Sequence, residues 1–281
     1  MNTKIIPYNK LTIQDDFIFG KVFSDLKLLI PLLKRILPGV NVDGFKTVVS
    51  QKTVDEFYES HGIRIDVYGE NGEFITAVEM HINRQTMPVK RPRYYQSVLD
   101  MMQLNKGIFY DNLKQQYVII ICPYDPFNAK IPVYTFTNRC HENGMELGDG
   151  TTKIFLNCAS DQWDEYPELK PFADYVMGKN KSDDSFIREL DKAVVMARQN
   201  VQWRKEYMNL QEKMYLSKKE GMEIGRDEER LNGIYKAYTG IAEVSCAEVA
   251  LRKTAEIYNL TEEEVKEALS RFEEEMKDPD K

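Results

Sequence analysis

Two acidic side chains and a histidine, Asp66, Glu79 and His81, are of the types that could hold a divalent cation. Carboxylate oxygens are the ligands that Mg²⁺ and Mn²⁺ prefer in proteins. Two carboxylates on one half-buried surface repel each other, so the fold gains nothing from the pair unless a cation neutralises it. The pair therefore predicts a Mg²⁺ site, with Mn²⁺ as an alternative, if local structure brings Asp66 and Glu79 together.

A β-hairpin is predicted around this pair. Residues 63–68 alternate apolar with polar side chains, and residues 74–81 likewise place Phe74, Thr76, Val78 and Met80 on one face and Ile75, Ala77, Glu79 and His81 on the other, as expected of strands. Between them lies Asn71-Gly72, a strong hairpin signal because both residues tolerate the positive φ of a type I′ turn. The sequence therefore predicts two antiparallel strands joined by Asn71-Gly72.

This loop sets the predicted register of the hairpin. It pairs Asp66 with Ala77 and makes Glu79 the diagonal neighbour of Asp66 on the same face, roughly 7–8 Å away. A four-residue loop would pair Asp66 with Ile75 and would leave the faces unchanged. His81 lies two residues beyond Glu79 and shares its face. In either register the three side chains occupy one surface.

The same spacing resembles a known nuclease signature. Asp66, twelve further residues and then Glu79-Met80-His81 resemble the Asp-(x)n-(Glu/Asp)-x-Lys motif of the PD-(D/E)xK nucleases. From about residue 10 to residue 229, the chain resembles one family of that group, the transposase-like, recombination-promoting nucleases (the Rpn group). The segments that carry the likeness are residues 11–23, Val78-Glu79-Met80, Arg93-Tyr94-Tyr95-Gln96-Ser97, residues 117–122, Asp125-Pro126-Phe127, residues 134–140 and Gly148-Asp149-Gly150.

The resemblance implies an α/β (α+β) fold with a restriction-endonuclease-like core, in which helices flank a mixed central sheet. It also implies a Mg²⁺-dependent DNA endonuclease that acts in transposition, recombination or defence against foreign DNA. Asp66 and Glu79 would hold the metal, and the carbonyl of Met80 would join them. The bound metal would polarise the phosphate and lower the pKa of the attacking water.

His81 departs from the resemblance, because the superfamily normally carries Lys at this position and the family often carries Gln. A histidine beside two carboxylates should have a raised pKa, so His81 could still act as a cationic donor. It could instead ligate a softer metal such as Mn²⁺ or Zn²⁺, or simply pack on the sheet. The sequence leaves these interpretations open.

Asp16 is expected near the start of a helix that runs from a Thr12 N-cap to Pro38-Gly39. The resemblance implies that an acid on the first helix lines the active site, and Asp16 matches that position. An acid that only complements the helix dipole is an equally good interpretation.

Three basic residues, Lys90, Arg91 and Arg93, stand at the start of a helix predicted over residues 92–104, where they could meet phosphate. Arg93 belongs to the Arg-Tyr-Tyr run of the family, which favours a functional role. For Lys90 and Arg91, a solvated surface is the better interpretation. DNA is the partner that the resemblance implies for all three.

Composition limits the alternatives. The net charge of −7 and the pI near 5.3 argue against tight, sequence-blind DNA binding, so any DNA contact needs a local basic patch. No signal peptide and no membrane span are predicted, which favours the cytoplasm. The four cysteines lie far apart, match no zinc spacing and are predicted to be reduced, buried thiols: Cys122, Cys140, Cys158 and Cys246.

The predicted organisation has three parts. Residues 1–218 form the nuclease-like domain, and its last helix is predicted over residues 185–218. Residues 219–240 form a charged helical linker with glycines at a spacing of four. Residues 241–281 form a small helical module, in which Thr261 and Glu264 make a capping box. These C-terminal helices are the predicted site of any homo-oligomer.

Two functions remain open at this level. The first is the endonuclease described above, which the Asp66–Glu79 pair favours. The second is a catalytically weak or inactive protein of the same fold that binds DNA or a protein partner. His81 and the acidic pI favour the second.

Overall fold

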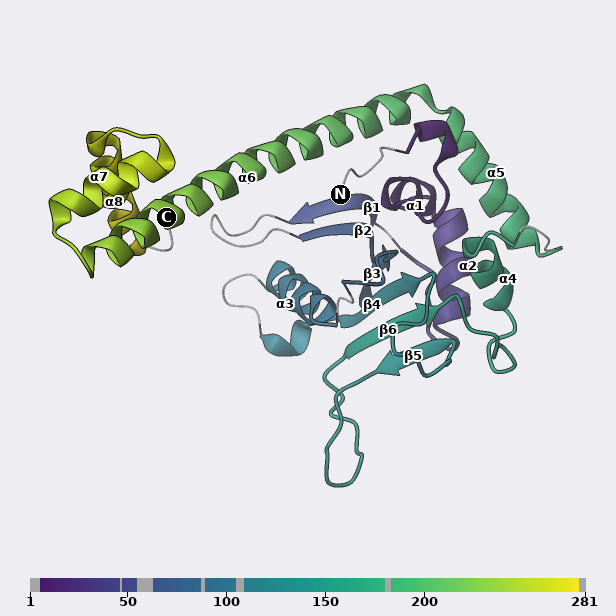
Figure 1. The fold of residues 1–281 in the computed structure, drawn as a ribbon. Coiled ribbons are helices and arrows are strands. Elements are labelled where there is room, and N and C mark those ends of the chain that lie inside the picture. The colour runs from purple at the N-terminus through teal and green to yellow at the C-terminus, as the bar shows by residue number, and fades with distance from the viewer. Residues whose placement is uncertain are drawn as a thin grey trace. The chain divides into compact units, whose positions relative to one another are not determined.

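The computed structural model describes residues 6–45, 47–54, 63–86, 89–104, 109–179 and 183–277 (Figure 1). The chain divides into two compact units, one ending at Tyr207 and the other beginning at Met208. None of the helices in these ranges is long and apolar enough to cross a membrane.

The first unit is built on a six-stranded sheet with the order β1-β2-β3-β4-β6-β5. The pairings of β3 with β4 and of β4 with β6 are parallel, and the others are antiparallel. The prediction of a mixed sheet flanked by helices is therefore confirmed. The strands are β1 (Thr47–Val54), β2 (Ile63–Glu70), β3 (Phe74–Met80), β4 (Gln115–Cys122), β5 (Val133–Phe136) and β6 (Thr151–Asn157).

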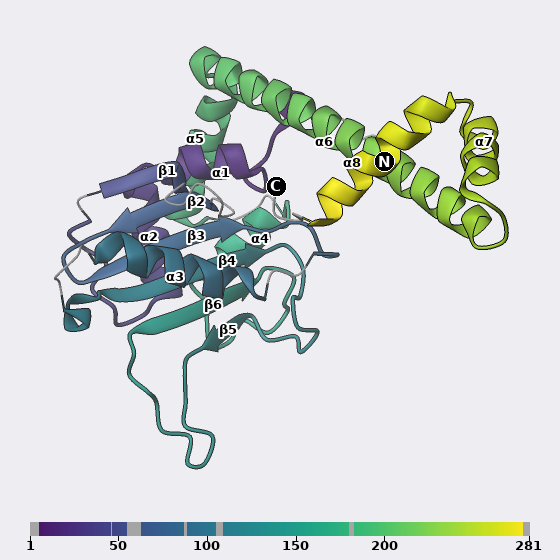
Figure 2. The same ribbon diagram turned by 90° about the vertical axis from the view of Figure 1, so that its left-hand side faces the viewer.

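Helices cover both faces of this sheet (Figures 1 and 2). On one face, α3 buries Tyr95 and Leu99 against Ala77 and Val118 of the central strands. On the other face, α1 packs against β1, β2 and β3. The helices of the unit are η1 (Tyr8–Lys10), α1 (Asp16–Phe23), α2 (Leu26–Ile36), α3 (Arg91–Gln103), η2 (Tyr110–Asn112), α4 (Lys170–Val176) and α5 (Ser185–Gln199).

The register of the β2–β3 hairpin differs from the prediction. Glu70 pairs with Ile75, and the backbone N–H of Asn71 donates to the carbonyl of Phe74, so the loop is Gly72-Glu73 rather than Asn71-Gly72. The Asn71 side chain explains the difference, because its Oδ1 accepts hydrogen bonds from the backbone N–H groups of Glu73 and Phe74. Asparagine therefore opens the turn instead of occupying its centre.

This register moves each residue of β3 by two positions relative to β2. The predicted alternation of β2 does not hold along the whole strand, because Ile63 and Ile65 pack in the same core cluster as Tyr68. Val67 pairs with Val78, and one step further along the two strands Asp66 meets Glu79 instead of Ala77. The two carboxylates are therefore directly opposite each other rather than diagonal.

The N-terminal helix is two helices, where one was predicted. Asp15, not Thr12, is the N-cap of α1, and its side chain accepts hydrogen bonds from the N–H groups of Phe17 and Ile18. Asp25 then caps α2 through the N–H of Lys27. Side-chain caps explain both boundaries, because a carboxylate that satisfies free N–H groups starts a new helix.

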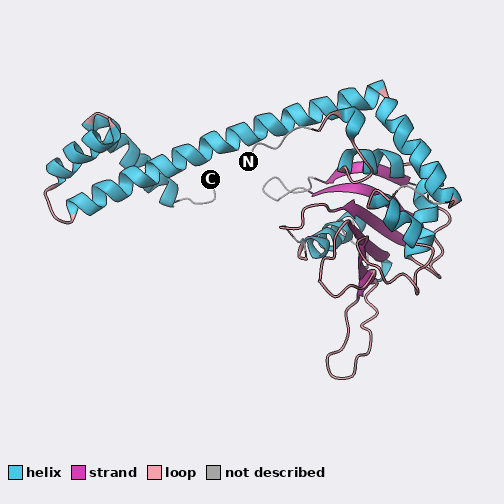
Figure 3. Ribbon diagram, turned by 45° about the vertical axis from the view of Figure 1, so that its right-hand side comes forward, coloured by secondary structure: helices cyan, strands magenta, loops and turns pink. Residues whose placement is uncertain are grey.

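The helix predicted over residues 185–218 is also interrupted. Asn200 has extended backbone angles and its side chain caps the next helix through the N–H of Trp203. The following helix, α6 (Val201–Ala242), continues through the whole predicted linker (Figure 3). The boundary between the two units at Tyr207 therefore lies inside a helix.

The second unit packs the C-terminal part of α6 with α7 (Ala247–Tyr258) and α8 (Glu262–Lys277). Ile234, Ala255 and Val265, one from each helix, form its small core. The capping box is present, because the hydroxyl of Thr261 accepts from the N–H of Glu264 and the Glu264 carboxylate accepts from the N–H of Thr261.

The cysteines only partly follow the prediction. All four are free thiols, and Cys122 and Cys158 are buried at the ends of β4 and β6. Cys140 is partly exposed and Cys246 is exposed. Cys246 is exposed because it is the N-cap residue of α7 and lies outside a core. Residue type alone therefore predicted its burial wrongly.

Candidate functional site

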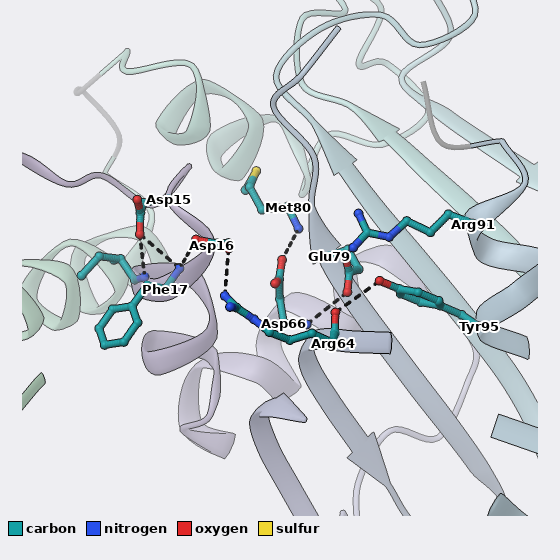
Figure 4. Close-up of polar contacts among 10 residues, drawn as sticks. Asp15, Asp16, Phe17, Arg64, Asp66, Glu79, Met80, Arg91 and Tyr95 are labelled. Atoms are coloured by element: carbon teal, nitrogen blue, oxygen red, sulfur yellow. Dashed lines mark hydrogen bonds and ion pairs between the residues drawn. The ribbon is translucent and has the colours of Figure 1, made fainter. Parts of the chain in front are cut away.

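Asp66 and Glu79 lie side by side where β2 and β3 separate (Figure 4). The backbone ladder between β2 and β3 ends at the pair Val67–Val78. Beyond this pair, carboxylate oxygens take the place of backbone carbonyls as hydrogen-bond acceptors. The N–H of Asp66 donates to Glu79 Oε1 at 3.1 Å, and the N–H of Met80 donates to Asp66 Oδ2 at 3.0 Å. Each strand thus orients the carboxylate of the other.

The backbone around Asp66 is also irregular on its other side. The β1–β2 ladder pairs Ser50 with Val67 and Lys52 with Ile65, but it passes over Gln51 and Asp66. Gln51 has a φ of 52°, in the left-handed region that few residues other than glycine adopt. Backbone strain of this kind is often retained where a side chain must be aimed at a functional site.

Helix α1 approaches this point closely. A Cβ atom on Gly20 would lie 2.9 Å from the carbonyl oxygen of Asp66, so only glycine allows the helix to rest on β2 here. This contact holds the Asp66 backbone between α1 and the rest of the sheet. Gly20 is a supporting residue of the site that its position in the sequence did not reveal.

Both carboxylates are almost fully buried, with exposed fractions of 5% for Asp66 and 3% for Glu79. Burial raises the pKa of Asp66 well above its usual value, and the neighbouring Glu79 raises it further. Burial likewise raises the pKa of Glu79, against the opposing effect of Arg91. The pair is therefore short of positive charge, and two hard oxygen donors in this state suit a small divalent cation.

The metal-ligand set is small. Within the part of the chain that the structure describes, no group of three or more His, Cys, Asp or Glu side chains converges on one point. The donors that fit a hard cation are thus the two carboxylates of Asp66 and Glu79. Water and substrate oxygens usually complete the coordination of Mg²⁺ in such sites.

Arg91 provides a positive charge from α3. Its Nη2 atom lies 3.6 Å from Glu79 Oε2, and its guanidinium carbon lies 5.2 Å from the centre of the Tyr95 ring. Tyr95 is buried, and its hydroxyl donates to the carbonyl of Arg64 at 3.2 Å. Arg91 was interpreted as a solvated surface residue; its side chain is indeed 46% exposed, but it also forms an ion pair with Glu79. A signal existed in the sequence, since Arg91 and Tyr95 are one helical turn apart.

Asp16 lies at the edge of the site. Its Oδ2 accepts a hydrogen bond from Arg64 Nη2 at 2.9 Å, and its charge contributes to the raised pKa of Asp66. Its Oδ1 also accepts from the N–H of Phe17 in the first turn of α1. Asp16 therefore has both of the properties proposed for it, proximity to the site and a place at the helix start.

His81 does not behave as expected. Burial and the charge of Arg91 lower its pKa, whereas the prediction was a pKa raised by the carboxylates. Its Nδ1 atom lies 2.6 Å from the hydroxyl of Tyr124, and its backbone N–H donates to Ile121. The strand carries His81 past the carboxylates to the end of β4, so Arg91 is the charged group that acts on it.

Lys90 and Arg93 are exposed at the start of α3, next to Arg91. Of the adjacent tyrosines, Tyr95 is buried whereas Tyr94 is 40% exposed. The predicted basic residues thus fall on one helical turn, and Arg91 is the member of this turn that contacts a carboxylate of the site.

The sequence matches no family model, no curated protein and no solved structure. Function must therefore be argued from the geometry of the Asp66–Glu79 pair and of the charged groups around it.

Proposed function

We propose that this protein is a metal-dependent DNA endonuclease of the transposase-like, recombination-promoting type, with a restriction-endonuclease-like core. The observation that carries the proposal is the reciprocal arrangement of Asp66 and Glu79, in which each carboxylate accepts a backbone N–H from the opposite strand. A fold seldom buries two adjacent carboxylates in this manner unless a cation offsets their charge.

Asp66 and Glu79 would hold Mg²⁺ or Mn²⁺ together with the carbonyl of Met80. The bound ion would polarise the scissile phosphate and lower the pKa of the attacking water. Asp16 and Arg64 would orient groups at the α1 side of the site, where they form an ion pair with an N–O distance of 2.9 Å.

The basic residues at the start of α3, Lys90, Arg91 and Arg93, would contact the DNA backbone. Because the chain has a net charge of −7, we propose that such a local patch supplies the attraction for phosphate. The proposed setting is the cytoplasm, and the C-terminal helices are the proposed contact of a homo-oligomer.

A second candidate is a protein of this fold that binds DNA or a protein partner without cutting. The specific observation in its favour is His81, whose Nδ1 is engaged by Tyr124 and whose pKa is lowered. It therefore lacks the charge expected of the lysine that the superfamily normally carries at this position.

Nicking of supercoiled plasmid tests the two candidates. The endonuclease should nick with Mg²⁺ or Mn²⁺, and EDTA should stop the reaction. Asp66→Asn and Glu79→Gln should each lower the rate by a factor on the order of 10³, the scale of a lost charge in a catalytic centre. Glu189→Gln, on the exposed face of α5, is the matched control and should nick as the parent does. DNA binding without nicking in the parent would favour the second candidate.

A further inference from the structure

Arg91, the first residue of α3, holds Glu79 loosely. The separation of 3.6 Å between Arg91 Nη2 and Glu79 Oε2 exceeds the roughly 2.7–2.9 Å of a charge-assisted hydrogen bond. The Arg91 side chain is 46% exposed, while that of Glu79 is 4% exposed. The pair therefore joins a buried, fixed carboxylate to a cation that reaches solvent.

Tyr95 gives the guanidinium a second contact besides Glu79. Its ring lies one helical turn along α3 from Arg91 and within cation–π distance of it. The Tyr95 hydroxyl is bonded to the carbonyl of Arg64, so the ring is held in place from the β2 side. Arg91 can therefore leave Glu79 and still stay at the mouth of the site.

The other basic groups nearby are engaged elsewhere. Arg64 forms an ion pair with Asp16, with an N–O distance of 2.9 Å. His81 lies 2.6 Å from the Tyr124 hydroxyl. The charge of Arg64 also acts on both carboxylates and lowers their pKa values, but among these three residues Arg91 is the one that forms an ion pair with a carboxylate of the proposed metal centre.

We propose that Arg91 is an exchangeable counter-ion: it neutralises Glu79 in the cation-free protein and turns to a substrate phosphate once a divalent cation occupies the carboxylates. This inference rests on the proposed function. The charges favour it, because a divalent cation balances the charges of Asp66 and Glu79 and leaves the guanidinium in excess beside the entering phosphate. Arg91 would then supply the phosphate with a positive charge from α3. His81, which directly follows β3, does not supply such a charge.

The inference predicts opposite effects on two measurements. Removing Arg91 removes a competitor of the metal, so Mn²⁺ should bind more tightly. The same change removes a cation that meets the phosphate in the transition state, so cleavage should slow. If Arg91 merely supported the fold or only oriented Glu79, its removal would weaken Mn²⁺ binding and also slow cleavage.

The metal measurement uses the full chain without DNA, and the electron paramagnetic resonance signal of free Mn²⁺ reports binding. Arg91→Met keeps an apolar stem over Tyr95, and Arg91→Ala provides a second form of the test. Both should bind Mn²⁺ on the order of tenfold more tightly than the parent, by loss of a nearby positive charge. Arg91→Lys keeps the charge and should bind as the parent does. Arg93→Met removes the same charge from the same exposed turn and should leave Mn²⁺ affinity unchanged.

Plasmid nicking at saturating Mn²⁺ measures the second predicted effect, the change in the rate of cleavage. Arg91→Met should nick roughly 10²–10³-fold more slowly than the parent, although it binds metal better. Unchanged or weaker Mn²⁺ binding by both Arg91→Met and Arg91→Ala would overturn the counter-ion role. If the parent and Glu79→Gln bind Mn²⁺ equally poorly, the metal centre itself is wrong and the proposed function fails with it. The result for the parent distinguishes the two failures.

Discussion

The backbone N–H of Asp66 donates to the carboxylate of Glu79 at 3.1 Å, at the point where the β2–β3 ladder ends. Its counterpart is the bond from the N–H of Met80 to Asp66 at 3.0 Å. The carboxylates thus serve two purposes, because they replace lost strand hydrogen bonds and they gather negative charge in a buried place. Substitutions can separate the two purposes.

Glu79→Gln should raise the thermal stability of the cation-free protein while it abolishes cleavage. The amide oxygen can still accept from the N–H of Asp66, but no buried charge remains beside Asp66. We expect a gain of about 1 kcal/mol in the free energy of unfolding at neutral pH, the low end for relief of an uncompensated buried charge. Calorimetry with EDTA measures it. Added Mn²⁺ should stabilise the parent and not the variant, and equal stabilisation of both would contradict the metal centre.

The raised pKa of Asp15 should make the stability of the protein depend on pH, independently of Asp66 and Glu79. Burial and the neighbouring Asp16 raise the pKa of Asp15 to about 6. Because this folded-state pKa is above the unfolded value of about 3.9, its contribution to stability is full below pH 4 and is lost as pH rises through 6. Asp15→Asn keeps an N-cap acceptor but cannot ionise.

Asp15→Asn should therefore match the parent near pH 4 and exceed its stability at pH 8, by on the order of 1 kcal/mol. Chemical unfolding at the two pH values is the measurement. Asp25→Asn, at the exposed N-cap of α2, is the matched control. The idea fails if the difference between Asp15→Asn and the parent is the same at both pH values.

Gly20→Ala should disturb the backbone of Asp66, on which α1 packs, and so distort the site. The new Cβ would lie 2.9 Å from the carbonyl oxygen of Asp66, so α1 or β2 must move. We expect a loss of roughly 1–3 kcal/mol in stability, the usual cost of overpacking, together with weaker Mn²⁺ binding. Gly221→Ala in α6, where a Cβ would meet no atom within 4 Å, should instead stabilise its helix slightly. A Gly20→Ala protein as stable as the parent would show that the contact is not limiting.

Removal of the residues after Lys218 should leave the first unit folded. That unit ends at Tyr207, whose ring lies 5.5 Å from Phe17 and 5.6 Å from Tyr8 between ring centres. A chain ending at Asn200 loses these contacts and should unfold at a lower temperature. Circular dichroism melting compares the two truncations. Sedimentation of the full chain and of the chain ending at Lys218 shows whether the protein self-associates through the C-terminal helices that the truncation removes. Loss of cooperative unfolding in the chain ending at Lys218 would show that the C-terminal unit supports the first.

The local patterns of the sequence predicted much of the first unit. Alternation of side chains identified both strands of the hairpin. The strands follow from the sequence because a period of two is a property of a strand itself. The capping box of Thr261 and Glu264 was predictable for the same reason, since its partners are three residues apart.

Competition between several acceptors for the same N–H groups was harder to predict. Thr12, Asp15 and Asp16 are all plausible caps, and Asp15 is the residue whose side chain accepts the N–H groups of Phe17 and Ile18 and so begins α1. Asn71 likewise could occupy the centre of a turn or open it, and its two bonds to Glu73 and Phe74 decided the register.

The sequence by itself determined that Asp66 and Glu79 lie on the two strands of one hairpin, because the strand and turn signals are local. The tertiary structure decided the rest of the site. It placed the carboxylates opposite each other, sent His81 to Tyr124 and brought Arg91 over Tyr95 to Glu79. The hairpin depends on local patterns along the chain, whereas these partners come from α3 and from the segment that follows β4. Their positions depend on how helices and strands pack, which spacing along the chain does not encode.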